Sequence, residues 1–220
     1  MFVERDITYE ARKEVQDGSD LGNLKIKIEE CINKAFGQEM PKDEVSKAIK
    51  GTLVVIAQDG EQVVGFASLK YGKLDDGQRY LVRNRVKRGN LAYSLDAGVV
   101  DRNHQGIGIY ENLNRYRMQH VIDDKSPVVF TTTQNPKVEK GVVKILNEYI
   151  KQGLLIAYET HHYKLLGFYG RRLTNYPIDT KDTPYNELNI AAGDAFIIAF
   201  FLKYPNGVNQ LKFDNNGFKA

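Results

Sequence analysis

The chain has 220 residues, of which 42% are hydrophobic and 27% are charged. This composition is ordinary for a soluble globular protein and supplies enough apolar side chains for one good core or two small ones. No apolar run approaches the length of a membrane span, and the first residues lack the apolar segment of a secretory signal, so we expect a cytoplasmic protein without membrane contact. Cys31 is the only cysteine, which excludes an internal disulfide and a cysteine-based metal cluster.

Hydrophobic periodicity and turn residues predict seven strands and four helices in mixed order along the chain. Two helices follow the first strand, a hairpin around Asp59-Gly60 comes next, and strands alternate with helices from residue 91 until the last two strands. The predicted strands cover residues 7–12, 52–58, 62–70, 91–100, 128–133, 154–165 and 195–203. The predicted helices cover residues 21–36, 41–51, 105–121 and 135–152.

Three polar segments interrupt or follow this pattern. Six basic side chains and two acidic ones lie between residues 73 and 90, although the whole chain carries a net charge of only +3. This predicted long basic loop is either a solvated segment or an attractor for an acidic partner such as coenzyme phosphates, an acidic substrate or nucleic acid. Residues 170–193 are predicted to form an insertion before the last strand, and residues 205–220 a loosely held tail.

The turn after the strand 91–100 indicates a binding site. It reads Asn103-His104-Gln105-Gly106-Ile107-Gly108 and opens directly into a helix. Glycines remove side chains where a ligand must approach the backbone, and the free amides and dipole of a helix start attract anions. The turn lacks the Lys-Ser/Thr pair of a P-loop and the third glycine of a dinucleotide-binding motif. We therefore expect a phosphorylated ligand of another kind.

This turn resembles motif A of the GNAT N-acetyltransferases, [RQ]-x-x-G-x-[GA]. Reading from Asn103 keeps both glycines but places Asn where Arg or Gln is usual, and reading from Gln105 places Tyr110 where Gly or Ala is usual. We prefer the first register because close backbone approach depends on the glycines. A second segment, Tyr149-x-x-x-Gly153-Leu154, resembles the Y-x-x-x-G-F ending of the family's fourth helix, and Gly153 also suits a helix C-cap.

The resemblance implies one GNAT N-acetyltransferase domain over residues 1–220, with an α/β fold in which a mixed central sheet of about seven strands is flanked by about four helices. It implies acetyl-CoA as the acyl donor, with pantetheine paired to the fourth strand and pyrophosphate held by the turn. It also implies direct transfer of the acetyl group to a primary amine. The residues that it assigns to the coenzyme are Val99, Val100, Asn103, His104, Gln105, Gly106, Ile107, Gly108, Ile109, Tyr110 and Asn135.

Two residues are candidates for the chemistry. The resemblance implies that Tyr149 protonates the departing thiolate, whereas its place in an apolar helical stripe also suits a core aromatic. Asp96, an acid inside a mostly apolar strand, is either the base that deprotonates the amine or a structural acid paired with an arginine of the basic loop. The predicted helix is longer than the family pattern, so Asn135 lies further from Tyr149 than expected.

The histidines give weaker signals. His161 and His162 are adjacent in a strand, so their side chains point to opposite faces and at most one can face a cleft. No metal-ligand spacing accompanies them, and we expect no metal. His104 lies inside the turn and is expected to shape it.

Two other functions compete with the acetyltransferase. One is a non-catalytic regulator that binds acyl-CoA through the same turn, and the other is a nucleic-acid-binding protein that uses the basic segment 73–90. The second is weaker because this segment interleaves only Tyr80 as an aromatic. The acceptor can be a small molecule, a protein or a peptide, and a homodimer is possible.

Overall fold

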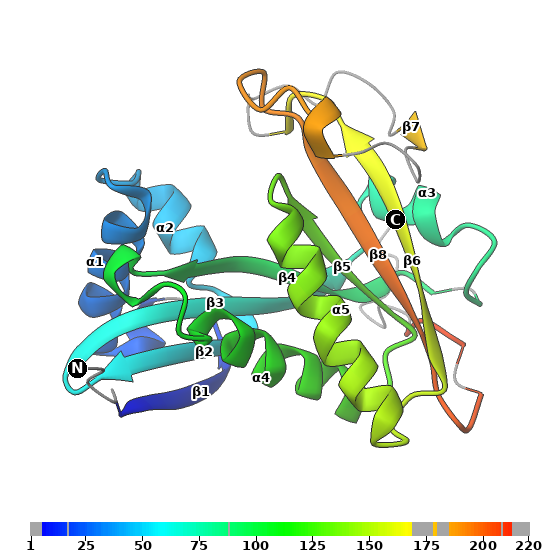
Figure 1. The fold of residues 1–220 in the computed structure, drawn as a ribbon, viewed down its shortest axis with the longest axis horizontal. Helices are drawn as coiled ribbons and strands as arrows, with labels where there is room; N and C mark the ends of the chain where they lie inside the picture. The colour runs from blue at the N-terminus through cyan, green and yellow to red at the C-terminus, as the bar shows by residue number, and fades with distance from the viewer. Residues whose placement is uncertain are drawn as a thin grey trace, which may run out of the picture. The chain divides into compact units, whose positions relative to one another are not determined.

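The computed structural model describes residues 6–16, 18–87, 89–168, 178–179, 185–207 and 209–212. The chain divides into two compact units, the first formed by Met1–Lys70 and Leu95–His120 and the second by Tyr71–Ser94 and Val121–Ala220. Figure 1 shows the elements in chain order. No helix within the described ranges combines the length and the apolar character needed to cross a membrane.

The first unit is built on strands in the order β1-β2-β3-β4, of which the last contributes residues 95–100, and the pairs β1/β2 and β2/β3 are antiparallel. Its helices connect β1 to β2 and follow β4. The elements are β1 (Ile7–Val15), α1 (Leu24–Phe36), α2 (Lys42–Ala48), β2 (Gly51–Asp59), β3 (Gln62–Lys73), β4 (Leu91–Val100) and α4 (Ile109–Asp123).

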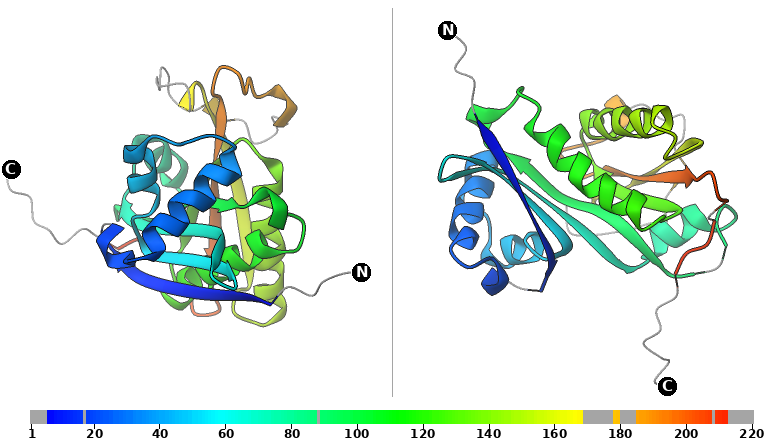
Figure 2. Two further views of the ribbon diagram at one scale, coloured as in Figure 1. Left: turned by 90° about the vertical axis from the view of Figure 1, so that its left-hand side faces the viewer. Right: turned by 90° about the horizontal axis from the view of Figure 1, so that it is seen from below.

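The two faces of the first sheet carry different helices (Figures 1 and 2). Ile56 and Phe66 are partners across β2 and β3 and belong to the core that α1 and α2 complete. The next pair, Ala57 and Gly65, faces α4, since a Cβ atom on Gly65 would lie 2.8 Å from Ile109 Cγ2. Gly65 therefore allows α4 to pack closely on β3, which fixes the start of α4 relative to the sheet.

The second unit has the strand order β4-β5-β8-β6-β7, with residues 91–94 supplying the start of β4. The pairs β5/β8, β6/β8 and β6/β7 are antiparallel. Strand β8 is central, and its first eight residues are all buried. The elements are α3 (Asp76–Val82), β5 (Val128–Thr133), α5 (Pro136–Lys151), β6 (Ala157–Leu165), β7 (Ile178–Asp179) and β8 (Ala195–Lys203).

The mixed α/β fold expected from the sequence is confirmed, and all seven predicted strands are present. Several other bounds differ by up to three residues, as in β1, which ends at residue 15 and not at 12, and α1, which begins at residue 24 and not at 21. The short strand β7 was not predicted. Three further differences have a clear local cause or position. The basic segment contains α3, which begins with a capping box between Asp75 and Gln78. The helix predicted from residue 105 begins at residue 109, because two glycines with left-handed backbone precede it. The strand predicted from residue 154 begins at residue 157, after the turn that ends α5.

Two predicted segments lie largely outside the described residues. Of the insertion predicted at 170–193, the structure describes the two residues of β7 and residues 185–193. Of the tail predicted at 205–220, it describes residues 205–207 and 209–212.

Candidate functional site

The glycine turn (residues 101–108) joins β4 to α4 in the first unit. Residues Arg102–His104 form a single 3₁₀ turn, and α4 begins at Ile109. Gly106 has φ +83° and Gly108 has φ +86°, a left-handed conformation that side chains disfavour, and a Cβ atom on either would meet nothing within 4 Å. These glycines are therefore required by backbone conformation and not by packing. The turn presents open main chain beside a helix start, as expected for an anion site.

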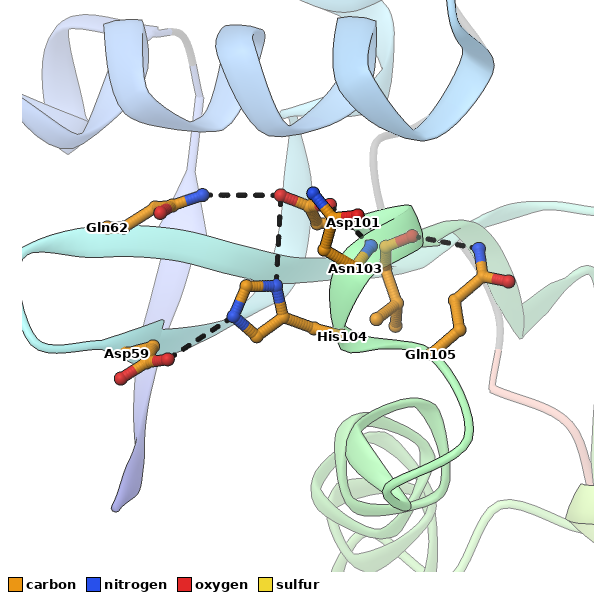
Figure 3. Close-up of polar contacts among 7 residues, drawn as sticks. Asp59, Gln62, Asp101, Asn103, His104 and Gln105 are labelled. Carbon is orange, nitrogen blue, oxygen red and sulfur yellow. Dashed lines mark hydrogen bonds and ion pairs between the residues drawn. The ribbon is translucent and has the colours of Figure 1, made fainter. Parts of the chain in front are cut away.

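Asp101 fixes the entrance of the turn from a buried position. Its carboxylate accepts hydrogen bonds from the backbone N–H of Asn103 at 2.9 Å and from Nε2 of Gln62 at 3.2 Å (Figure 3). Its own N–H donates to the carbonyl of Val64 at 2.9 Å. Only 2% of Asp101 is exposed. The first residue of the turn is thus tied to β3 by both its main chain and its side chain.

Two more side chains brace the turn against neighbouring elements. His104 is buried and places Nε2 3.2 Å from Oδ2 of Asp59 at the end of β2 (Figure 3). Arg102 donates from Nε and Nη2 to the carbonyls of Ala35 and Phe36 at the end of α1, over distances of 3.3 and 3.2 Å. A guanidinium at a helix C-terminus is favoured by the helix dipole. The contact of His104 with Asp59 joins the turn to the end of β2, in keeping with the expectation that this residue shapes the turn.

Gln105 and Ile107, the side chains next to the glycines, leave the backbone of the turn accessible. Gln105 turns back and donates from Nε2 to the carbonyl of Val100 at 3.3 Å. Ile107 lies between the two glycines and is 54% exposed. A ligand at this turn would therefore meet main-chain atoms and an apolar side chain. The turn has Asn103 at the motif position where Arg or Gln is usual, and its own arginine, Arg102, is bound to the carbonyls at the end of α1.

The fold of the molecule matches known structures, although its sequence does not match known families. No protein-family model matches the sequence, and no curated protein matches it. The chain superposes on NAA60 of Arabidopsis thaliana in complex with acetyl-CoA, with a TM-score of 0.52, 11% identity, and coverage of 89% of this chain and 99% of that one. It also matches the ribosomal-protein-S18-alanine N-acetyltransferase of Escherichia coli, with a TM-score of 0.52, 9% identity, and coverage of 92% and 97%. The fold is that of the GNAT N-acetyltransferases.

Within this GNAT fold, the side chain of Tyr110 packs against β4. A Cβ atom on Gly98 would lie 2.9 Å from Cε2 of Tyr110, so this glycine is needed for the contact. The Tyr110 hydroxyl accepts a hydrogen bond from Arg117, which also donates to the carbonyls of Ser68 at 2.9 Å and Ala97 at 3.2 Å. Burial lowers the pKa of Arg117, while Tyr110 and Asp96 act to raise it. Arg117 also donates from Nη2 to Oδ1 of Asn114. In the sequence, only the helical spacing of residues 110, 114 and 117 points to this buried arginine.

Asp96 lies on β4 with 38% of its side chain exposed, where it forms an ion pair with Lys70 of β3. Its partner is therefore a lysine of the same unit and not an arginine of the basic segment. The arginines of that segment include two that hold α3 in place. Arg79 donates to the carbonyl of Leu74 and Arg85 to that of Leu81, each at 3.1 Å.

Tyr149 and Asn135 belong to the second unit, at the two ends of α5. Tyr149 is 5% exposed and shares the buried stripe of this helix with Val142, Ile145 and Leu146. Asn135 caps the helix start, where its Oδ1 accepts a hydrogen bond from the N–H of Lys137 at 2.9 Å. Both residues thus have structural roles in α5. The glycine turn and Asp96 lie in the first unit.

His161 and His162 contact different elements, as expected for neighbours in a strand. His161 lies 3.2 Å from Nη2 of Arg85, beyond the end of α3, whereas His162 lies 2.7 Å from Oε1 of Glu139 on α5. Among the described residues, no three His, Cys, Asp or Glu side chains come together as a metal site would require.

Proposed function

We propose that this chain is an acetyl-CoA-dependent N-acetyltransferase that transfers the acetyl group directly to a primary amine. The observation that carries the proposal is the glycine turn, in which two left-handed glycines with open space beside them precede a 15-residue helix. Helix-start amides and unhindered main chain are what a diphosphate needs. The GNAT fold supports the coenzyme assignment, because the NAA60 structure that it resembles holds acetyl-CoA.

The proposal gives the coenzyme two contacts with the first unit. The turn residues, from Asn103 to Tyr110, would hold the pyrophosphate through their main chain, and Val99 and Val100 would pair with the pantetheine as an added strand. Asn135 of the second unit is proposed as a further coenzyme contact on the resemblance alone. No metal is required by this chemistry, because the helix start supplies the positive potential.

The chemistry needs one proton acceptor and one proton donor. In the proposal, Asp96 takes a proton from the ammonium group of the acceptor, and the amine nitrogen then attacks the thioester carbonyl. The C–N bond forms as the C–S bond breaks, and Tyr149 protonates the departing thiolate. The nitrogen releases its second proton to solvent as the amide forms, and solvent returns a proton to the Tyr149 oxygen, so the protons balance. Replacement of Asp96 by Asn should then lower turnover about 100-fold or more while acetyl-CoA still binds. Unchanged turnover would remove Asp96 from the mechanism.

A second candidate function is a regulator that binds acyl-CoA without transferring the acyl group. Two observations favour it: Asp96 is held in an ion pair by Lys70, and Tyr149 is buried in the stripe of α5. The two functions share the coenzyme site and differ only in turnover. The acceptor can belong to several classes, including polyamines, protein lysines and protein N-termini.

Two measurements test these proposals in order. Isothermal titration calorimetry with acetyl-CoA and with CoA should show binding, and acetyl-CoA at about 100 times its Kd should stabilise the protein by about 2.7 kcal/mol. Release of free thiol is then measured with a panel that contains a polyamine, a lysine peptide and a peptide with a free N-terminus. Thiol release above hydrolysis supports the transferase. Binding without release with any amine supports the regulator, and no binding overturns both.

A further inference from the structure

Lys70 and Asp96 form an ion pair across neighbouring strands of the first unit. Nζ of Lys70 contacts Oδ2 of Asp96, and β3 and β4 are adjacent in the sheet (Figure 1). The seven residues of β3 that precede Lys70 are all buried, so Lys70 is the first side chain of this stretch that reaches solvent. Among the ten described residues of β4, only Asp96 is exposed. Both charged groups therefore lie where the two strands become accessible.

A buried arginine holds the main chain on both sides of this ion pair. Arg117 of α4 is 1% exposed and donates from Nη1 to the carbonyl of Ala97, next to Asp96, and to that of Ser68, two residues before Lys70. Arginine keeps its charge in proteins, and the charges of Arg117 and Asp96 attract each other. Asp96 therefore keeps a compensating cation when Lys70 carries no charge.

The ion pair places a primary amine where the proposed reaction needs one. A base that deprotonates an acceptor must lie within hydrogen-bond reach of the acceptor nitrogen. Nζ of Lys70 already has this contact with Asp96, the proposed base. Asp96 also lies on the same strand as Val99 and Val100, which are proposed to pair with the pantetheine. An amine held in this way needs no separate binding step before it reacts.

We propose that Lys70 is an acetylation site, which the chain modifies within the same molecule. The inference rests on the proposed function and names one acceptor for it. Asp96 takes a proton from the Lys70 ammonium group, and Nζ attacks the thioester carbonyl of acetyl-CoA. The C–N bond forms as the C–S bond breaks, and Tyr149 protonates the CoA thiolate. Nζ and Asp96 each release one proton to solvent, which returns one to Tyr149. The products are acetyl-lysine, CoA and one proton.

Peptide mass spectrometry after incubation with acetyl-CoA tests the inference. The acetyl group carries ¹³C, so that acetylation acquired before the incubation is counted separately. Calorimetry on the same protein measures binding of acetyl-CoA.

Lys47 is the internal control for direct reaction with the thioester. It also contacts a carboxylate, Asp43 at 3.2 Å, and its side chain is 72% exposed against 39% for Lys70. Acetylation by exposure alone should therefore favour Lys47. The matched variants are Asp96→Asn and Asp43→Asn, each of which replaces the carboxylate beside one lysine by an amide of the same size.

We expect the wild-type protein to acetylate Lys70 about 100-fold faster than Lys47, which is the contribution of a well-placed general base. The rate constant should not depend on protein concentration, because acceptor and base belong to one molecule. Asp96→Asn should lower the rate at Lys70 to that at Lys47, and Asp43→Asn should leave both rates unchanged. Unlabelled acetyl-lysine at position 70 of the purified wild-type protein, absent from Asp96→Asn, counts as the same result.

Three results would overturn the inference while acetyl-CoA still binds. The first is acetylation of Lys70 no faster than that of Lys47 in the wild-type protein, which needs no variant to fold. The second is a wild-type rate at Lys70 in Asp96→Asn. The third is a rate constant that rises with protein concentration, which would make Lys70 an acceptor for another molecule. Absence of acetyl-CoA binding would instead overturn the proposed function.

Discussion

The glycine turn of the first unit and the end of α5 in the second unit use the same residue type for different purposes. Gly153 has φ +74°, like Gly106 and Gly108, and a Cβ atom there would also meet nothing within 4 Å. At the end of α5, however, Gly153 donates to the carbonyl of Ile150 at 3.0 Å, and Leu154 donates to that of Tyr149 at 2.9 Å. These amides close a helix, whereas the glycine turn leads into one. A left-handed glycine therefore indicates a ligand site only when a helix start follows it.

The largest effect is expected for Tyr149 at the end of α5, where a catalytic role and a core role predict opposite results. If Tyr149 protonates the thiolate, Tyr149→Phe should lower turnover by about 100-fold or more and leave acetyl-CoA affinity unchanged, because only the proton donor is lost. The control is Tyr163→Phe, since Tyr163 is also buried in the second unit at 4% exposure. Steady-state thiol release checks both. Equal activity of the two variants would assign Tyr149 to the core alone.

The next largest effect is expected for Gly108→Val. A branched side chain at φ +86° strains the turn by about 1–2 kcal/mol, which should weaken acetyl-CoA binding about tenfold by depopulating the binding conformation. Gly22→Val is the matched control, because Gly22 has φ +54°, no neighbour within 4 Å of its Cβ position, and a place outside the turn. Calorimetry should show normal affinity for Gly22→Val. An equal loss in both variants would make the effect one of general stability.

The contrast between these regions also shows which features of the chain the sequence reveals. Period-two alternation in residues 91–100 predicted β4 to the residue, and the apolar run at 195–203 predicted β8 equally well. Turns such as the Asp59-Gly60 hairpin and the Gly106/Gly108 turn could also be predicted from the sequence, because glycine has few other reasons to occur in such positions. The α3 helix was missed because the basic composition of the surrounding segment, residues 73–90, resembles a solvated loop, while the capping box of the helix involves only Asp75 and Gln78.

Side-chain contacts across long sequence separations were not predictable. The pairs His104–Asp59 and Arg102–Ala35 join residues 45 and 67 positions apart, and no local pattern specifies them. Arg117 is 1% exposed, although arginine in an amphipathic helix is normally expected on the surface. The glycine backbone of the candidate site can thus be predicted from the sequence. The side-chain contacts of Arg102 and His104 that hold it in place are known only from the fold.

A smaller effect is expected at Asp194, the counterpart of Asp101 in the second unit. Burial raises the pKa of Asp194, but hydrogen bonds from the N–H groups of Gly167 and Asn189 and the ion pair with Lys164 outweigh it, so the pKa is lowered. The stabilisation is therefore full above the unfolded pKa of about 3.9 and is lost as the pH falls through the lower folded value. Asp194→Asn should cost about 1 kcal/mol at pH 7, and this difference should shrink as the pH falls through that range.

Urea unfolding at neutral and acidic pH measures the Asp194 effect. Glu159→Gln provides the control, because Glu159 pairs with Lys203 on the surface and should change stability by less than about 1 kcal/mol. A constant difference between wild type and Asp194→Asn at all pH values would show that the carboxylate charge is not the stabilising feature.

The smallest difference is expected between two helix ends, the end of α1 against the glycine turn and the end of α5. Gly37 and Gly153 both follow a helix with left-handed φ, but a Cβ atom on Gly37 would lie 2.5 Å from Nη2 of Arg102. Replacement of either glycine by Ala adds the same backbone strain of about 1 kcal/mol. Gly37→Ala should cost about 0.5 kcal/mol more, because it also displaces the guanidinium from the helix carbonyls. In the Arg102→Met background this extra cost should vanish, so the changes in unfolding free energy of Gly37→Ala and Arg102→Met should not be additive in a double-mutant cycle. The changes for Gly153→Ala and Arg102→Met should be additive, which makes this pair the control. Additivity in both cycles would mean that Arg102 does not hold the turn to α1.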